Sequence, residues 1–130
     1  MMINTNRKVE LIDITDKVQE EVRNKSISNG ICVVSTPHTT TAIIINENES
    51  GLISDLLNLL NKLVPPGADY NHNRIDNNAD SHLRAMLLGS SEAIPVIDGK
   101  LTLGTWQRIF FVELDGPRQR KANITLIRQT

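Results

Sequence analysis

The chain has little of several residue types that often carry function. Its 130 residues include one cysteine, and aromatic residues make up only 3% of the chain. The single cysteine, Cys32, cannot form an internal disulfide, and its position in an apolar run predicts a buried, unreactive thiol. The formal net charge is −1, with acidic and basic residues interspersed. Few aromatics and no basic stripe argue against a nucleic-acid-binding face.

Long apolar runs are also missing. No stretch approaches the ~20 residues that a membrane-spanning helix needs. Residues 1–8 lack the apolar core of a signal peptide, so we expect a soluble protein of the reducing cytoplasm with no membrane partner. An apolar content of 39% suits one compact domain over residues 1–130. Such a domain can bury a core without metal or disulfide, so any metal would serve function rather than stability.

The spacing of apolar residues predicts an α+β protein. Short runs rich in β-branched residues predict strands over about residues 7–12, 30–36, 41–46, 93–97, 101–104, 108–114 and 122–128. Helical spacing predicts helices over residues 13–24, capped by Thr15 or Asp16, and over residues 49–63 and 80–88. Because neighbouring strands follow one another closely, we expect a single domain with a mostly antiparallel sheet and the helices packed on one face.

Three histidines are the leading candidates for a site. His38, His72 and His82 each lie among small, hydroxylated or amide residues. They are expected at a strand end, in the polar loop 68–78 and in the first turn of a helix, where the dipole keeps His82 neutral. Three neutral imidazoles could hold a divalent metal ion and leave a position open for water. The alternatives are that each ring satisfies nearby backbone groups or that the three bind an anion.

One carboxylate adds to these candidates. Glu47 lies between a strand and the longest predicted helix, where it could act as a general base or orient a histidine. Capping the helix is an equally good interpretation of Glu47. Asp80 is expected to cap the helix that contains His82.

A calcium loop is excluded by the residues that follow its apparent start. Asp76, Asn78 and Asp80 resemble the first ligands of such a loop, but Ser81 and Leu87 stand where glycine and glutamate are needed.

Anion-binding groups form a third set. Hydroxyl, amide and guanidinium donors for a phosphate are available in residues 39–41, 103–107 and 116–120. The alternative is that the threonines are strand formers on an outer face and that the arginines are solvated. Trp106 is expected to be a buried anchor or a subunit contact. No Ser/His/Asp triad, nucleophilic cysteine or Walker loop can be assembled.

These motifs, taken in order, resemble the YjbQ family, whose members are also called secondary thiamine-phosphate synthases. The resemblance covers most of the chain. Its motifs are His38-Thr39-Thr40, Asn46-Glu47-Asn48, Tyr70-Asn71-His72-Asn73, Ser81-His82-Leu83, Leu88-Gly89, Gly104-Thr105-Trp106-Gln107 and Gly116-Pro117-Arg118. Asn71 departs from the pattern, because some relatives carry glutamate there.

The resemblance implies a YjbQ-like α+β fold and a homotrimer with sites near subunit boundaries. It implies that His38, His72 and His82 surround one metal or anion site, with Glu47 and Arg118 as catalytic neighbours. The implied activity is that of a transferase that joins a hydroxymethylpyrimidine diphosphate to a thiazole phosphate, assisted by zinc or magnesium. The name is a loose guide to the physiological role.

Three other functions remain open at this point. A metal-dependent hydrolase of small phosphorylated molecules could use the same residues, with Glu47 activating water. A non-catalytic protein could bind a metal or anion. In a purely structural oligomer, the histidines would only stabilise the trimer.

Overall fold

The computed structural model describes residues 1–130 and shows an antiparallel α+β domain. The strands are β1 (Met2–Asn4), β2 (Glu10–Asp13), β3 (Gly30–Ser35), β4 (Thr41–Asn46), β5 (Ser91–Ile97), β6 (Lys100–Leu101), β7 (Arg108–Glu113), β8 (Gln119–Lys121) and β9 (Asn123–Arg128). The helices are α1 (Thr15–Asn24), α2 (Ser50–Leu63) and α3 (Ala79–Leu88), with a short 3₁₀ helix, η1 (Asn71–Arg74).

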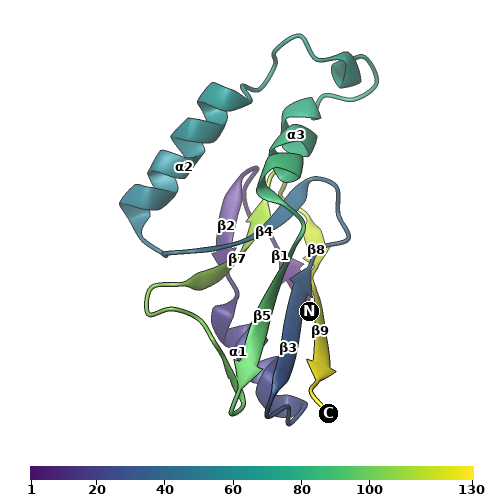
Figure 1. Ribbon diagram of the computed structural model, residues 1–130. Helices are drawn as coiled ribbons and strands as arrows, with labels where there is room; N and C mark the ends of the chain where they lie inside the picture. The colour runs from purple at the N-terminus through teal and green to yellow at the C-terminus, as the bar shows by residue number, and fades with distance from the viewer.

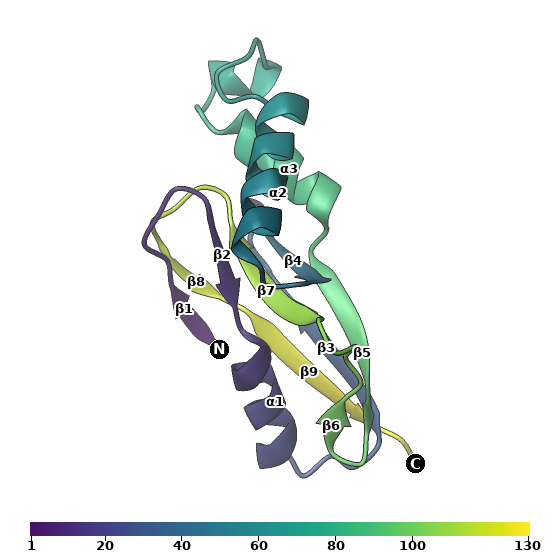
Figure 2. The same cartoon turned by 90° about the vertical axis from the view of Figure 1, so that its left-hand side faces the viewer.

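Every strand pairing is antiparallel. One sheet has the order β2-β7-β4, a second has the order β6-β5-β3-β9, and β1 pairs with β8 alone. Figure 1 shows α2 and α3 together at one end of the molecule and α1 at the other, and the second view agrees (Figure 2). The site described below is formed at the end that carries α3.

Strand β7 is apolar on both faces because it lies between two clusters of buried side chains. Ile109 and Phe111 point into the main core, which also contains Val18 and Val22 of α1. The alternate residues Phe110 and Val112 belong to a second cluster with Ala85 of α3. Alternate side chains of a strand point to opposite faces, so the continuous apolar run of β7 contributes to both cores.

Two helices begin at carboxylates that the sequence did not single out. The Asp13 carboxylate accepts hydrogen bonds from the backbone N–H and the hydroxyl of Thr15, at 3.0 and 2.7 Å. It therefore binds the start of α1, where Thr15 or Asp16 was expected to act as the cap. Glu49 caps α2 by accepting the backbone N–H groups of Gly51 and Leu52. Glu47 therefore does not cap α2.

Other expectations need correction as well. The strands β1 and β8 were not predicted. Trp106 is largely exposed in this chain, so it is not a buried anchor. Cys32 is fully buried, as expected, and burial raises the pKa of its thiol to about 11.

Candidate functional site

Two of the three predicted histidines lie against each other. His72 comes from η1 and His82 from the first turn of α3, and their ring centroids are 4.8 Å apart with the planes at 68°. Both rings line a cavity of about 300 Å³. Its other lining residues are Tyr70, Asn71, Ala79, Leu83 and Met86. The polar loop 68–78 thus supplies one wall and α3 supplies the other.

The third histidine reaches the same helix from the opposite side. His38 lines a second cavity, of about 430 Å³, together with His82, and Met86 also borders both cavities. The remaining lining residues are Thr36, Pro37, Thr39, Thr41, Ala85, Gly89 and Ser90. We call the two neighbouring cavities, which share His82 and Met86 as lining residues, the histidine groove.

The ring of His38 is held by the backbone of a distant strand. Its Nε2 accepts the backbone N–H of Lys121 in β8 at 3.0 Å. The backbone N–H of His38 donates to Thr36 Oγ1 at 3.3 Å. Burial lowers the pKa of His38, and the positive charge of Arg120 lowers it further, against a weaker opposing effect of Glu113. His38 is therefore biased toward the neutral form.

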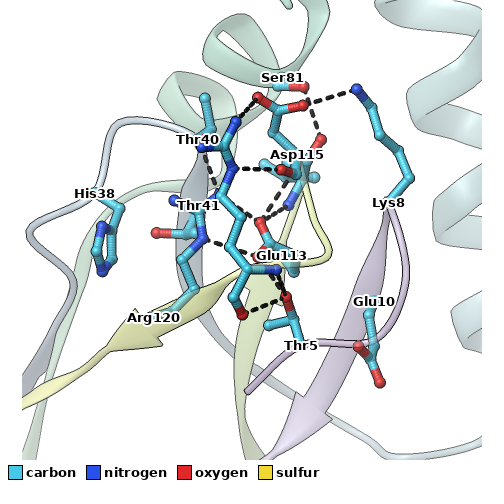
Figure 3. A network of polar contacts seen from close by, with 12 residues as sticks. Thr5, Lys8, Glu10, His38, Thr40, Thr41, Ser81, Glu113, Asp115 and Arg120 are labelled. Atoms are coloured by element: carbon cyan, nitrogen blue, oxygen red, sulfur yellow. Dashed lines mark hydrogen bonds and ion pairs between the residues drawn. The ribbon is translucent and has the colours of Figure 1, made fainter. Parts of the chain in front are cut away.

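Beside His38 lies a buried ion pair that sequence reasoning missed (Figure 3). The Arg120 guanidinium donates to both carboxylate oxygens of Glu113, at 2.8 and 2.6 Å, and to Thr40 Oγ1 at 2.8 Å. Thr5 and two backbone N–H groups complete the shell of Glu113. Burial would raise the pKa of Glu113, but the bonds to Arg120, Thr5 and the backbone outweigh it and lower that pKa. The pair anchors β8 next to the loop that carries His38.

A second polar chain leads from Asp115 to His72. Asp115 accepts from Lys8 Nζ at 2.7 Å, from Arg118 at 3.1 Å and from Asn78 Nδ2 at 3.0 Å. Asn78 Oδ1 in turn lies 3.0 Å from His72 Nε2. Burial opposes ionisation of Asp115, but the bonds to Lys8 and Asn78 and the charges of Lys8 and Arg118 hold its pKa below the usual value. The predicted residue Arg118 therefore connects to the groove through Asp115 and Asn78.

The structure does not gather the three imidazoles into one ligand set. It contains no group of three or more His, Cys, Asp or Glu side chains placed to hold a metal ion. One ring nitrogen of His38, Nε2, is already occupied by a backbone N–H. Only His72 and His82 are paired. The three-histidine metal centre therefore remains a prediction that the geometry of this chain does not support.

Glu47 lies elsewhere. It borders a separate cavity of about 190 Å³ between α2 and the β2-β7-β4 sheet, whose lining is mostly apolar. No histidine lines that cavity. Within one chain, Glu47 is therefore not placed to act on a group bound beside the histidines.

Comparison with known proteins agrees with the fold and the motifs. The family model described as "UPF0047 protein YjbQ-like" matches residues 1–129. A UPF0047 protein of Methanothermobacter thermautotrophicus is 56% identical over 95% of this chain and 87% of its own length. The UPF0047 protein YugU of Bacillus subtilis is 34% identical over 98% of this chain and 96% of its own length.

Solved structures show the same fold. A YbjQ-like protein of unknown function from Sulfolobus solfataricus superposes with a TM-score of 0.96 at 44% identity, covering 99% of this chain and 94% of that one. A hypothetical protein from Aeropyrum pernix gives a TM-score of 0.95 at 42% identity, covering 99% and 96%.

Fold and groove together define a small antiparallel α+β protein with histidines at one end. The chain belongs to the YjbQ-like UPF0047 family. The names of these relatives state no activity. None of the helices has the length and apolar character required to cross a lipid bilayer.

Proposed function

We propose that the histidine groove binds a small phosphorylated molecule and catalyses transfer of a group from it. The observation that supports this is the convergence of all three histidines, from three separate segments, on two cavities that share His82. Neutral imidazoles and hydroxyl groups are suited to binding phosphate oxygens and moving protons. The substrate pair implied by the family resemblance is a hydroxymethylpyrimidine diphosphate and a thiazole phosphate.

The transfer requires one bond to form and one to break. The thiazole nitrogen bonds to the methylene carbon of the pyrimidine, while the bond from that carbon to the diphosphate oxygen breaks and its electron pair leaves with pyrophosphate. The task of the protein is to hold both substrates in line and to stabilise the departing negative charge. His38 and Thr39 line the groove, and the largely exposed Arg118 is connected to its His72 side through Asp115 and Asn78.

A divalent ion, zinc or magnesium, is a separate part of the proposal. The two paired rings, His72 and His82, are donors that suit zinc better than magnesium, which prefers oxygen. When bound, such an ion would neutralise charge on a diphosphate. The metal-dependent hydrolase is less well supported, because its proposed base, Glu47, lies in another cavity.

Following what the resemblance implies, we also propose that this activity belongs to a cytoplasmic homotrimer with its sites near subunit boundaries. Apolar side chains left exposed on α2 and α3, among them Leu59, Leu63 and Met86, are consistent with burial against further copies of the chain.

The test is an assay of the purified full-length protein with both substrates and added Mg²⁺ or Zn²⁺, following thiamine phosphate by chromatography. We expect product, and a loss of at least about 100-fold in His82→Ala, the size typical of removing one group that stabilises the charge of the transition state. Thr125→Ala, at an exposed position on β9, is the control and should keep full activity. Absence of product, or an unchanged His82→Ala, would overturn the proposal. Stoichiometric pyrophosphate binding without turnover would instead indicate a binding protein.

The metal content of the same samples tests the ion independently. We expect zinc in the wild-type protein, its loss in His72→Ala and His82→Ala, and its retention in His38→Ala. Equal loss in all three variants would restore the three-histidine centre that the sequence predicts.

A further inference from the structure

The proton on His38 can be placed from its hydrogen bond. A backbone N–H can only donate, so the Nε2 of His38 must accept from Lys121 with its lone pair. A neutral imidazole carries one N–H, so the proton of His38 lies on Nδ1. A solvated histidine prefers the opposite arrangement, with the proton on Nε2. The fold therefore imposes the less favoured tautomer on a ring that lines the groove.

The proton on His72 follows from the chain of contacts behind it. Asp115 also binds Lys8 and Arg118, and an ionised carboxylate only accepts, so the Asn78 amide must turn its NH₂ toward Asp115. This orientation leaves the Oδ1 of Asn78 facing His72 Nε2 at 3.0 Å. A carbonyl oxygen only accepts, so Nε2 of His72 carries a proton, and in the neutral ring Nδ1 is then bare.

We propose that the fold fixes opposite tautomers in two rings of the histidine groove, with the Lys121 amide setting His38 and the Asp115–Asn78 pair setting His72. His38 then presents an N–H donor, and His72 presents a lone pair. The inference deepens the proposed function, because it concerns the same site, but it rests on hydrogen bonds alone.

Opposite tautomers give the two rings different chemical roles in the groove. The Nδ1–H of His38 is suited to an anionic oxygen of a phosphate. The bare Nδ1 of His72 can take a proton or bind a cation. Asn78 and Asp115 are then positioning residues, since they act through His72. One hydrogen bond, from the half-buried Asn78 to Asp115 at 3.0 Å, ties this wall of the groove to the ion pairs behind it.

The experiment is long-range ¹H–¹⁵N correlation of the imidazole rings in the full-length protein, with a chelator present, at about pH 8, where histidines of ordinary pKa are neutral. Replacing each histidine by glutamine assigns the signals. We expect His38 to show the proton only on Nδ1 and His72 only on Nε2. In Asn78→Leu, His72 should show averaged signals of both tautomers while His38 stays unchanged. Asn77→Leu, at the exposed neighbouring position, should match the wild type.

The wild-type spectrum decides the matter even if a variant fails to fold. A proton on Nε2 of His38, or averaged signals for either ring, would overturn the assignment. An unaltered His72 in folded Asn78→Leu would remove Asn78 and Asp115 as positioning residues. If the protein is inactive but shows both tautomers as described, the proposed function is rejected and this inference stands. If the protein is active but its rings give averaged signals, this inference is rejected and the proposed function stands.

Discussion

At the residue scale, Asp13 joins several elements through one carboxylate. One oxygen accepts from Thr15 at the start of α1, and the other accepts from Arg108 Nε at 2.8 Å and Asn48 Nδ2 at 3.1 Å. Burial alone would raise the pKa of Asp13, but these hydrogen bonds together lower it from 3.8 to about 2. The ionised carboxylate therefore stabilises the folded state.

The stabilisation by Asp13 should disappear in acid. Because the folded-state pKa is depressed, the contribution is complete above about pH 4 and is lost as the pH falls through about 2. The shift corresponds to at most about 2.5 kcal/mol, and the side chain is only 18% exposed. Urea unfolding at several pH values should show Asp13→Asn less stable at neutral pH, with the gap to wild type closing in acid. Asp16→Asn, at a 92% exposed position that also contacts Arg108, should change little. A gap that stays constant with pH would contradict this account.

The residue types at the site were predictable, but their partners were not. Histidines among small polar residues marked the groove from the sequence alone. Nothing local indicated that Lys121 would donate to His38 or that Glu113 would pair with Arg120, because the first contact spans 83 positions and the second crosses a turn between strands. An arginine and a glutamate in β-rich segments read as solvated charges until the tertiary structure buries them.

At the element scale, long amphipathic segments were predicted well and very short ones were missed. Helix α2 and strands β3 and β4 are long enough for the leucine spacing of the helix and the β-branched runs of the strands to be recognised in the sequence. Strands β1 and β8 have three residues each, so neither shows a period. Their pairing is supported because β8 is fixed by the Glu113–Arg120 pair and by Thr5, whose Oγ1 accepts the backbone N–H of Arg118 at 2.8 Å.

The turn between β7 and β8 depends on a glycine. A Cβ at Gly116 would lie 2.3 Å from the Arg7 carbonyl oxygen, 2.8 Å from Glu113 Cγ and 2.9 Å from Thr5 Oγ1. Backbone and buried side chains surround this position, so the neighbours cannot move aside cheaply. We expect Gly116→Ala to lower the free energy of unfolding by about 1–3 kcal/mol, measured by urea denaturation.

A matched glycine provides the control for that substitution. At Gly104 the nearest atom to a Cβ is 3.4 Å away and belongs to the flexible side chain of Gln107, so Gly104→Ala should be close to neutral. Equal stability of the two variants would show that the turn adapts and that its close packing does not anchor β8.

At the scale of the whole molecule, the sequence predicted the fold class and the family more accurately than it predicted which residues form the site. The α+β class, the antiparallel pairing and the family were all predicted and are confirmed. The placement of Glu47 depended on whether the start of α2 faces the groove, which is a question of tertiary geometry. The structure places it in a different cavity from the histidines. The order of the motifs along the sequence thus identified the family, but it did not show which of their residues lie together in space.

The helices at the groove end leave apolar surface without a partner in the single chain. Leu59 and Leu63, one turn apart on α2, are 50% and 63% exposed, and Leu87 of α3 is also exposed. Figure 1 shows α2 standing beside α3 at the edge of the molecule rather than lying across a sheet. Side chains of this kind gain roughly 1.5–3 kcal/mol each when fully buried, so burial of this surface in an assembly is favourable.

If the chain forms the homotrimer proposed above, sedimentation equilibrium should give three times the 14.5 kDa mass of one chain. Replacing Leu59 and Leu63 together by glutamate should shift the protein to the monomer, because each charge would have to be buried unpaired. Ile97→Glu is the control: Ile97 is 55% exposed but ends β5, at the opposite end of the molecule from α2 (Figure 1). A monomeric wild type would refute the trimer, and a trimeric double variant would place its interface away from α2. Since the histidine groove borders α3, loss of assembly and loss of activity in the same variant would further indicate that the groove is completed by a neighbouring subunit.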